Sequence, residues 1–279
     1  MRLLERQSDG GFCLTKNLHD EDISRYPYAI LSHRWGQEDE EVTFEDIERG
    51  SGRDKAGYKK IEFCGEQAKK DGLKYFWVDS CCIKKSSDPE LSEAIKSMYR
   101  WYSCAARCYV YLSDVSTAKR KRGAKSAQDT WELSFKASNW FSRGWTLQEL
   151  LAPELVEFYS QEHKRLGDKI SLSRQIHEVT GIALSALQGL SLSQFSVDER
   201  FKWADNRQTT RQEDWAYCLL GIFDVSIPLI YGEGRGRAIN RLKKEINEAS
   251  SSKNKEPSMY SFKLGVVFAA LLTAMRADR

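Results

Sequence analysis

The residues best suited to chemistry in this sequence are a tryptophan and a glutamate four positions apart, Trp145 and Glu149, within the segment WFSRGWTLQELLAP. Positions four apart lie on one face of a helix. An indole beside a carboxyl group keeps water away from it, which raises the pKa of the carboxyl and suits it to chemistry on a cation-like centre. Arg143, just upstream, could pair with that carboxylate or with an anionic ligand.

The same segment is also compatible with a purely structural role. Its aromatic and leucine side chains would form core, and Glu149 would cap a helix or form a salt bridge. Buried ion pairs are also common causes of perturbed carboxyl groups. The rest of the chain must decide between the two interpretations.

Three short apolar runs predict the strands that would position these groups. They span residues 28–32, 75–79 and 108–112, and helical patterns separate them, which favours an α/β fold with a parallel sheet. Polar residues follow each run, and the carboxyl ends of parallel strands meet at one edge of a sheet. We therefore expect a ligand-binding rim made of His33, Arg34, Trp35 and Asp79, within reach of Glu149.

Other interpretations of this rim stay open. His33 could be a hydrogen-bonded structural histidine, and Asp79 could cap the loop that follows it. Cys81 and Cys82 could supply a thiolate with His33 as its base, although adjacent cysteines after an apolar strand usually pack as small hydrophobic residues. A zinc site would need cysteines whose spacing fits no ordinary finger: Cys81, Cys82, Cys104 and Cys108.

The remaining pattern predicts an N-terminal hairpin, a strand at 155–159 and a series of helices. Three capping boxes are expected, beginning at Thr43, Ser196 and Thr210. The loop 232–236 could cradle an anion, or could simply lead into a helix. The basic run 116–127 is expected to be a solvated loop. The predicted helices span residues 58–71, 89–105, 169–180, 197–204, 212–220 and 235–248.

Composition excludes some classes of protein and places the chain in a cell compartment. The net charge of +3 does not favour a nucleic-acid partner. The N-terminus has no secretory pattern, and the seven cysteines suggest reduced thiols, so a cytoplasmic location is expected. The apolar run 260–275 is shorter than the roughly 20 residues of a spanning helix. It is interpreted as a weak membrane-surface or partner helix, or as an aberrant end of the gene model.

Three motifs in this order resemble the fungal heterokaryon-incompatibility (HET) domain. They are YAILSHRWG at 28–36, YFWVDSCCI at 75–83 with the helix after it, and RGWTLQELLAP at 143–153. The run 207–223, with PLIYGEG at 228–234, resembles the segment that follows this domain in incompatibility proteins. The motifs imply a HET domain over 1–160, a helical extension over 161–249, and a linker with a short apolar tail over 250–279. One position departs from the family pattern, because Lys84 stands where many members carry Asp.

The resemblance implies a role in non-self recognition and programmed cell death, a form of fungal innate immunity. It also implies a TIR-like, that is flavodoxin-like, parallel sheet flanked by helices, with a mostly helical C-terminal extension. By resemblance to TIR domains, Glu149 with Trp145 would be catalytic. The ligand-binding residues would be Ser32, His33, Arg34, Trp35, Asp79 and Arg143.

Two functions follow from the resemblance. In the first, Glu149 cleaves NAD at the nicotinamide–ribose bond, with NAD as substrate and no cofactor required. In the second, the domain is a non-catalytic assembly module. Its expected partners are a second copy of itself or a protein with a nucleotide-binding oligomerisation module.

Overall fold

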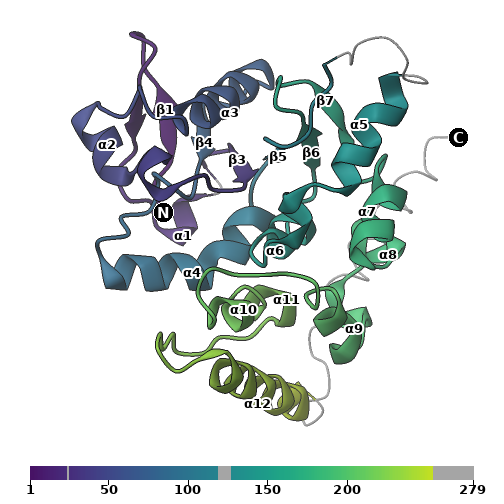
Figure 1. Ribbon diagram of the computed structural model, residues 1–279. Helices are drawn as coiled ribbons and strands as arrows, with labels where there is room; N and C mark the ends of the chain where they lie inside the picture. Colours follow the sequence, from purple (N-terminus) through teal and green to yellow (C-terminus); the bar gives the residue numbers. More distant parts are fainter. Residues whose placement is uncertain (24, 119–126, 254–279) are drawn as a thin grey trace, which may run out of the picture.

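The computed structural model describes residues 1–23, 25–118 and 127–253, in which a seven-stranded mixed sheet is covered by helices (Figure 1). The strand order is β2-β1-β4-β3-β5-β6-β7. The strands are β1 (Leu4–Arg6), β2 (Phe12–Leu14), β3 (Tyr28–His33), β4 (Tyr75–Trp77), β5 (Arg107–Tyr111), β6 (Val156–Tyr159) and β7 (Arg165–Asp168).

The prediction of a parallel sheet is correct for the centre and wrong for the edges. Strands β4, β3, β5 and β6 are parallel, whereas β1, β2 and β7 join antiparallel. Both edges come from hairpins: β1 turns into β2 at Gly10, whose φ of 83° favours glycine, and β6 turns into β7. The chain leaves β3 for β4 on one side and returns to β5 on the other, so the strand order reverses between β3 and β5.

Helices and 3-10 turns cover both faces of this sheet. The helices of the first part are α1 (Asp20–Ile23), α2 (Phe44–Arg49), α3 (Tyr58–Lys70), α4 (Asp88–Ser103), α5 (Ala127–Lys136) and α6 (Thr146–Leu151). Those that follow the sheet are α7 (Ser173–Thr180), α8 (Leu184–Leu187), α9 (Val197–Lys202), α10 (Asp214–Tyr217), α11 (Leu220–Phe223) and α12 (Arg235–Lys253). The 3-10 turns are η1 (Glu38–Glu40), η2 (Asn139–Ser142) and η3 (Leu192–Gln194).

Close packing fixes which helix lies on which face. Helix α3 lies against one face, where Gly65 lets the ring of Phe76 approach: a Cβ there would lie 3.2 Å from that ring. Helix α4 lies against the other face through Trp77 and Trp101, whose ring centroids are 5.7 Å apart. On this second face η2 adds Trp140, 5.6 Å from the ring of Phe158. The apolar strand runs are therefore buried on both sides, as parallel strands require.

The part of the chain after β7 is mostly helical and packs beside α4 and α6. Helices α7 to α12 run down one side of the molecule and along the bottom (Figure 1). Helix α11 packs closely on α4, where a Cβ at Gly221 would lie 2.1 Å from Cβ of Tyr99. Helix α12 continues to Lys253, past the predicted linker start at 250, and the sheet continues past residue 160.

Several local predictions can be compared with the helices. The capping boxes at Thr43 and Ser196 are confirmed. The third is wrong, because α10 begins at Asp214 without a side-chain cap, and the predicted helix 212–220 is split into α10 and α11. Helix α4 begins one residue before Pro89, with Ser87 as its N-cap. Strand β7 stands just before the predicted helix 169–180, of which only Ser173–Thr180 is helical.

Two predicted segments lie outside the described residues: the apolar tail 260–275 and most of the basic run 116–127. Among the helices of the described ranges, none combines the length and hydropathy needed to cross a bilayer.

Candidate functional site

Glu149 lies under the end of β3 and is joined to it by Ser32. The Ser32 hydroxyl donates a hydrogen bond of 2.5 Å to Oε2 of Glu149, and Nε1 of Trp140 donates one of 2.9 Å to the same hydroxyl. Glu149 is 6% exposed and Ser32 is fully buried. Helix α6 thus turns its carboxyl toward the strand edge and not into a salt bridge in the core.

This environment brings the titration of Glu149 into the neutral range. Burial is the main cause, and the charge of Asp79 adds to it. The hydrogen bond from Ser32 and the charges of Arg143 and Arg207 act in the opposite direction, and the pKa of Glu149 is raised to about 7. A carboxyl group of this kind can exist in both protonation states near neutral pH, which suits it to general acid–base chemistry or to stabilising a developing cation.

Asp79 and Trp35 form the more exposed part of the rim. Nε1 of Trp35 donates a 2.8 Å hydrogen bond to Oδ2 of Asp79, while Oδ1 is buried without a hydrogen-bond partner among the described residues. Lys85 and Arg143 both lie over the Trp35 ring, with Nζ and Cζ at 3.4 and 5.7 Å from its centroid. The loops after β3 and β4 therefore meet at one edge, and the segment after η2 joins them there.

His33 ends β3 between two carboxylates. Its Nδ1 lies 3.8 Å from Oδ1 of Asp79, and its Nε2 lies 3.8 Å from Oε2 of Glu41. Both distances exceed a hydrogen bond. Burial, with a contribution from Lys60, lowers the pKa of His33, so the imidazole is neutral at pH 7.

Glu41 was not singled out by the sequence, because it lies in an acidic run that resembles a solvated loop. In the structure it is buried, accepts a 2.6 Å hydrogen bond from the backbone of Gly36 and pairs with Lys60. The charge of Lys60 and its hydrogen bond lower the pKa of Glu41 despite burial. Glu41 therefore brings a fixed negative charge to the far side of His33.

The two tryptophans of the opening segment contact different groups: Trp140 lies in the core as expected, whereas Trp145 does not bond Glu149. Trp145 is the N-cap residue of α6, and its Nε1 donates a 3.4 Å hydrogen bond to Asp214 of α10. Its polar edge points to the helical extension, while the carboxyl of Glu149 points to Ser32. The indole linked to Glu149 through a shared hydroxyl is that of Trp140.

The other predicted residues are placed as follows. Arg34 is exposed. Cys81 is buried and burial raises the pKa of its thiol, which opposes a thiolate nucleophile. Cys104 is exposed while Cys108 is buried, and the described residues contain no group of three or more ligands that could hold a metal ion.

The anion cradled by the loop 232–236 belongs to the protein itself. The backbone N–H groups of Gly232 and Gly234 donate hydrogen bonds of 3.0 and 2.8 Å to Oε1 of Glu213. These donors lower the pKa of Glu213. These hydrogen bonds join the start of α10 to the loop that leads into α12.

The extension holds the first turn of α6 in place. The buried guanidinium of Arg207 donates to the carbonyl oxygen of Arg143 at 3.0 Å and to Oγ1 of Thr146 at 2.8 Å. The backbone N–H of Gly144 donates to the carbonyl of Gln208 at 2.8 Å. The position of Glu149 thus depends on residues about 60 positions further along the chain.

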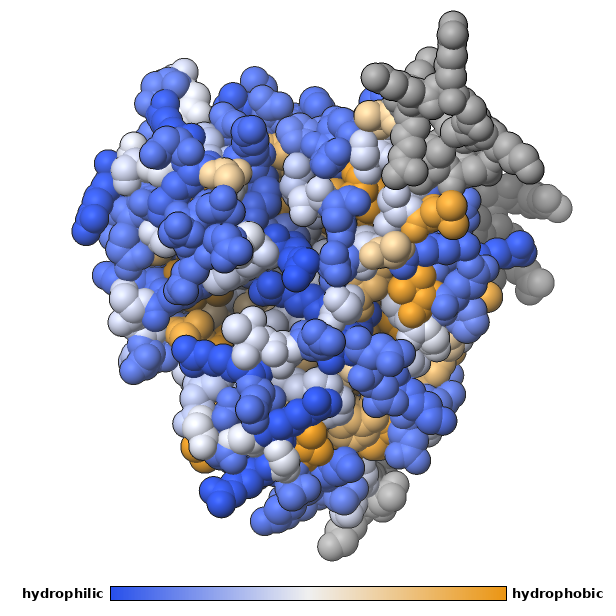
Figure 2. Space-filling view, viewed as in Figure 1, coloured by the Kyte–Doolittle hydropathy of each residue, from blue (hydrophilic) through white to orange (hydrophobic). Residues whose placement is uncertain are grey.

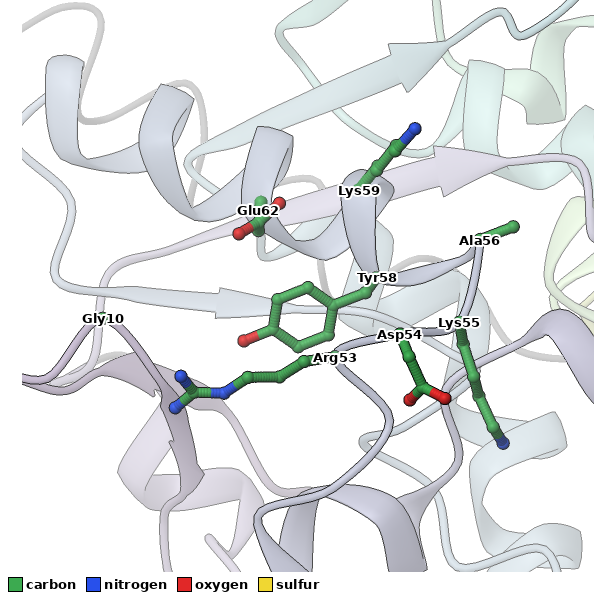
Figure 3. Close-up of a pocket in the computed structure, with 8 residues that line it drawn as sticks. All are labelled: Gly10, Arg53, Asp54, Lys55, Ala56, Tyr58, Lys59 and Glu62. Atoms are coloured by element: carbon green, nitrogen blue, oxygen red, sulfur yellow. The ribbon is translucent and has the colours of Figure 1, made fainter.

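Two hollows lie away from this rim. One of about 440 Å³ lies beside the β1–β2 turn, where Tyr58 and Arg53 approach Gly10 (Figure 3). The other, of about 1270 Å³, lies between α4, α11 and the end of α12. Neither is lined by Glu149, His33 or Asp79. The face seen in Figure 2 is mainly hydrophilic, with hydrophobic residues in small patches.

Comparison with known proteins gives two matches. Residues 28–134 match the family model described as heterokaryon incompatibility protein (HET). Over 248 residues the chain is 55% identical to vegetative incompatibility protein HET-E-1 of Podospora anserina, which covers 89% of this chain and 18% of that protein. The chain therefore spans less than a fifth of the length of this relative. No solved structure matches.

Proposed function

Because this chain is a HET-domain protein, we propose that it is an effector of vegetative incompatibility that triggers regulated cell death after non-self recognition, by cleaving NAD with Glu149. The first part of the proposal is supported by the 55% identity to HET-E-1, whose name describes vegetative incompatibility. We place this activity in the cytoplasm, where NAD is present.

The catalytic part is supported mainly by one observation, the buried carboxyl of Glu149 held at the strand edge by Ser32. The strand order supports it as well. The parallel strands have the order β4-β3-β5-β6, which supports the proposed flavodoxin-like, TIR-like sheet, and ligands of such sheets bind at the carboxyl edge where the order reverses. Glu149 and Asp79 both lie at that edge.

The chemistry follows from the substrate. The bond between ribose C1′ and the pyridinium nitrogen breaks with both electrons passing to the nitrogen, so nicotinamide leaves as a neutral molecule. Ionised Glu149 would stabilise the oxocarbenium-like ribose, and water would attack C1′ and lose a proton to give ADP-ribose. Oδ1 of Asp79 is available to accept a hydrogen bond from a ribose hydroxyl. Trp35 offers a ring for stacking, and Arg34 or Arg143 a cation for the pyrophosphate.

A second candidate, a non-catalytic assembly module, is favoured by burial. Glu149 is 6% exposed and Ser32 is fully buried, so their hydrogen bond would serve only to hold α6 against β3. The domain would then act by binding a second copy of itself or a protein with an oligomerisation module. The apolar tail 260–275 would add at most a weak membrane contact.

The experiment is NAD turnover by purified protein that is clustered artificially, compared with Glu149→Ala and Glu149→Gln. Loss of turnover in both variants, with folding retained, supports the enzyme. Undiminished turnover in Glu149→Ala excludes Glu149 as the catalytic group. No turnover by any variant, together with intact cell killing by Glu149→Gln, supports the assembly module.

A further inference from the structure

Among the described residues, two half-buried cations at the rim have no anionic partner. Lys85 and Arg143 both lie over the ring of Trp35, yet within the described ranges neither side chain forms a salt bridge or a hydrogen bond. The neighbouring cations have partners: Lys60 pairs with Glu41, and Arg207 donates to three oxygen atoms. The difference singles out the cations beside Trp35.

Their arrangement is unfavourable without an anion. Lys85 is half-buried, and burial lowers the pKa of its ammonium group while the charge of Arg143 lowers it further. Asp79 is close enough to act on Lys85 in the opposite direction, but its Oδ2 already accepts from Trp35. Two like charges beside one ring, partly removed from water, are stabilised when a multiply charged anion binds between them.

Their place in the fold is one where phosphorylated ligands bind. Lys85 lies in the loop after β4 and Arg143 directly after η2, so both belong to the carboxyl edge of the sheet. The reversal of strand order between β3 and β5 opens this edge to ligands in related α/β sheets. An indole ring and the unpartnered Oδ1 of Asp79 lie beside the cations.

We propose that Lys85 and Arg143 form a phosphate subsite for a nucleotide, whose ring or ribose is received by Trp35 and Asp79. The guanidinium offers paired donors to phosphate oxygens and the ammonium a point charge. A planar ring, hydroxyl groups and a phosphate are the three features that the neighbouring groups can recognise together. The identification of that nucleotide with NAD rests on the proposed function, whereas the subsite itself does not.

The test measures binding without turnover, by calorimetry on the Glu149→Gln protein. The probes are ADP-ribose and, separately, inorganic pyrophosphate. When Lys85→Gln is added to the Glu149→Gln protein, ADP-ribose should bind at least about tenfold more weakly than to Glu149→Gln alone. This is the loss of affinity expected for one charged hydrogen bond. Lys85→Arg, which keeps the charge, should recover most of the affinity.

The matched control is Lys84→Gln. Lys84 is the preceding residue, and its ammonium group lies over Phe44 at 5.6 Å instead of over Trp35. Lys84→Gln makes the same change in net charge as Lys85→Gln and should leave the affinity for ADP-ribose unchanged. Equal weakening by both substitutions would mean that only overall charge matters, and would overturn the subsite. Thermal unfolding of each variant checks that the fold is retained.

The two probes separate a nucleotide from a free anion. Tighter binding of ADP-ribose than of pyrophosphate supports a nucleotide, and equal binding overturns that assignment. Cleavage of NAD with a KM unchanged by Lys85→Gln would reject the subsite and leave the proposed enzyme intact. ADP-ribose binding that depends on Lys85, in a protein that never cleaves NAD, would support the subsite and reject the enzyme.

Discussion

The hydroxyl of Ser32 lies 2.5 Å from the carboxyl of Glu149, which is 117 positions further along the chain. This contact joins the end of β3 to α6, and Trp140 completes it from η2. One hydroxyl therefore satisfies a buried carboxyl and a buried indole at the same time.

Ser32→Ala should destabilise the protein by about 2 kcal/mol, because it leaves both of those groups without a partner. Urea unfolding measures the effect. Ser142→Ala is the control, since the Ser142 hydroxyl is exposed and only donates to the carbonyl of Asn139. A loss at Ser32 no larger than at Ser142 would mean that the Ser32–Glu149 contact does not form in solution.

The raised pKa of Glu149 makes stability depend on pH. Between its ordinary value of 4.5 and about 7, the folded state retains a proton that the unfolded state loses. The stability that wild type has while Glu149 is protonated is thus fully present below pH 4.5. It is lost as the pH rises to 7, which lowers the free energy of unfolding by about 3 kcal/mol in all. Glu149→Gln removes this dependence, so its stability relative to wild type should increase by that amount between pH 4.5 and 8. Denaturant unfolding at several pH values measures it, with exposed Glu154→Gln as control.

Asp79→Asn should lower the pKa of Glu149, because the charge of Asp79 is the second-largest cause of its rise. The asparagine oxygen can still accept from Trp35, so the rim should keep its shape. Carbon-13 NMR of labelled glutamate carboxyls follows the titration directly. The control is the exposed Asp39→Asn, which should leave the titration midpoint of Glu149 unchanged. If Asp79→Asn also leaves this midpoint unchanged, the carboxyl groups of Asp79 and Glu149 are further apart in solution than in the structure.

The apolar runs predicted the central strands well, because burial on both faces leaves a continuous hydrophobic signal. Strand β7 has no such signal, since Arg165–Asp168 is polar, short and at the sheet edge. Helical spacing relates Trp145 to Glu149, but the indole N–H of Trp145 bonds Asp214 in the extension, a tertiary contact that spacing does not encode.

The positions of Lys85, Glu41 and Arg207 could not be predicted, for a common reason. The first two lie in irregular loops, and Arg207 reaches α6 through a tertiary contact. No periodicity encodes such placements. The motif at 143–153 holds Glu149 and Arg143, which lie beside Ser32 and Trp35 in the structure. The convergence of the β3 and β4 ends followed from the parallel centre of the sheet.

Gly221→Ala should destabilise the protein by about 3 kcal/mol, because the added methyl would collide with Tyr99 where α11 crosses α4. Gly236→Ala, in α12 with nothing within 4 Å of the new Cβ, should instead stabilise by up to about 1 kcal/mol. Thermal unfolding of the pair compares them. Similar melting temperatures would indicate that the two helices do not pack this closely.

Arg207→Lys should lower the free energy of unfolding by about 3 kcal/mol. A single ammonium group cannot donate to the acceptors on Trp203, Arg143 and Thr146 together. The substitution should also reduce any activity that depends on Glu149, whose helix would lose its anchor. Exposed Arg174→Lys is the control for the change of cation. Full activity in a destabilised Arg207→Lys protein would show that the orientation of α6 does not depend on the extension.

The hydrogen bonds of Arg207 have a practical consequence for the transfer of this domain between proteins. A gene fusion cut at residue 160, or at the limit of the family match at 134, would separate α6 from the side chain that fixes it or remove α6 altogether. The smallest exchangeable cassette therefore includes Arg207 as well as the sheet. Recombination breakpoints that preserve function are expected after Gln208, not between the sheet and α9.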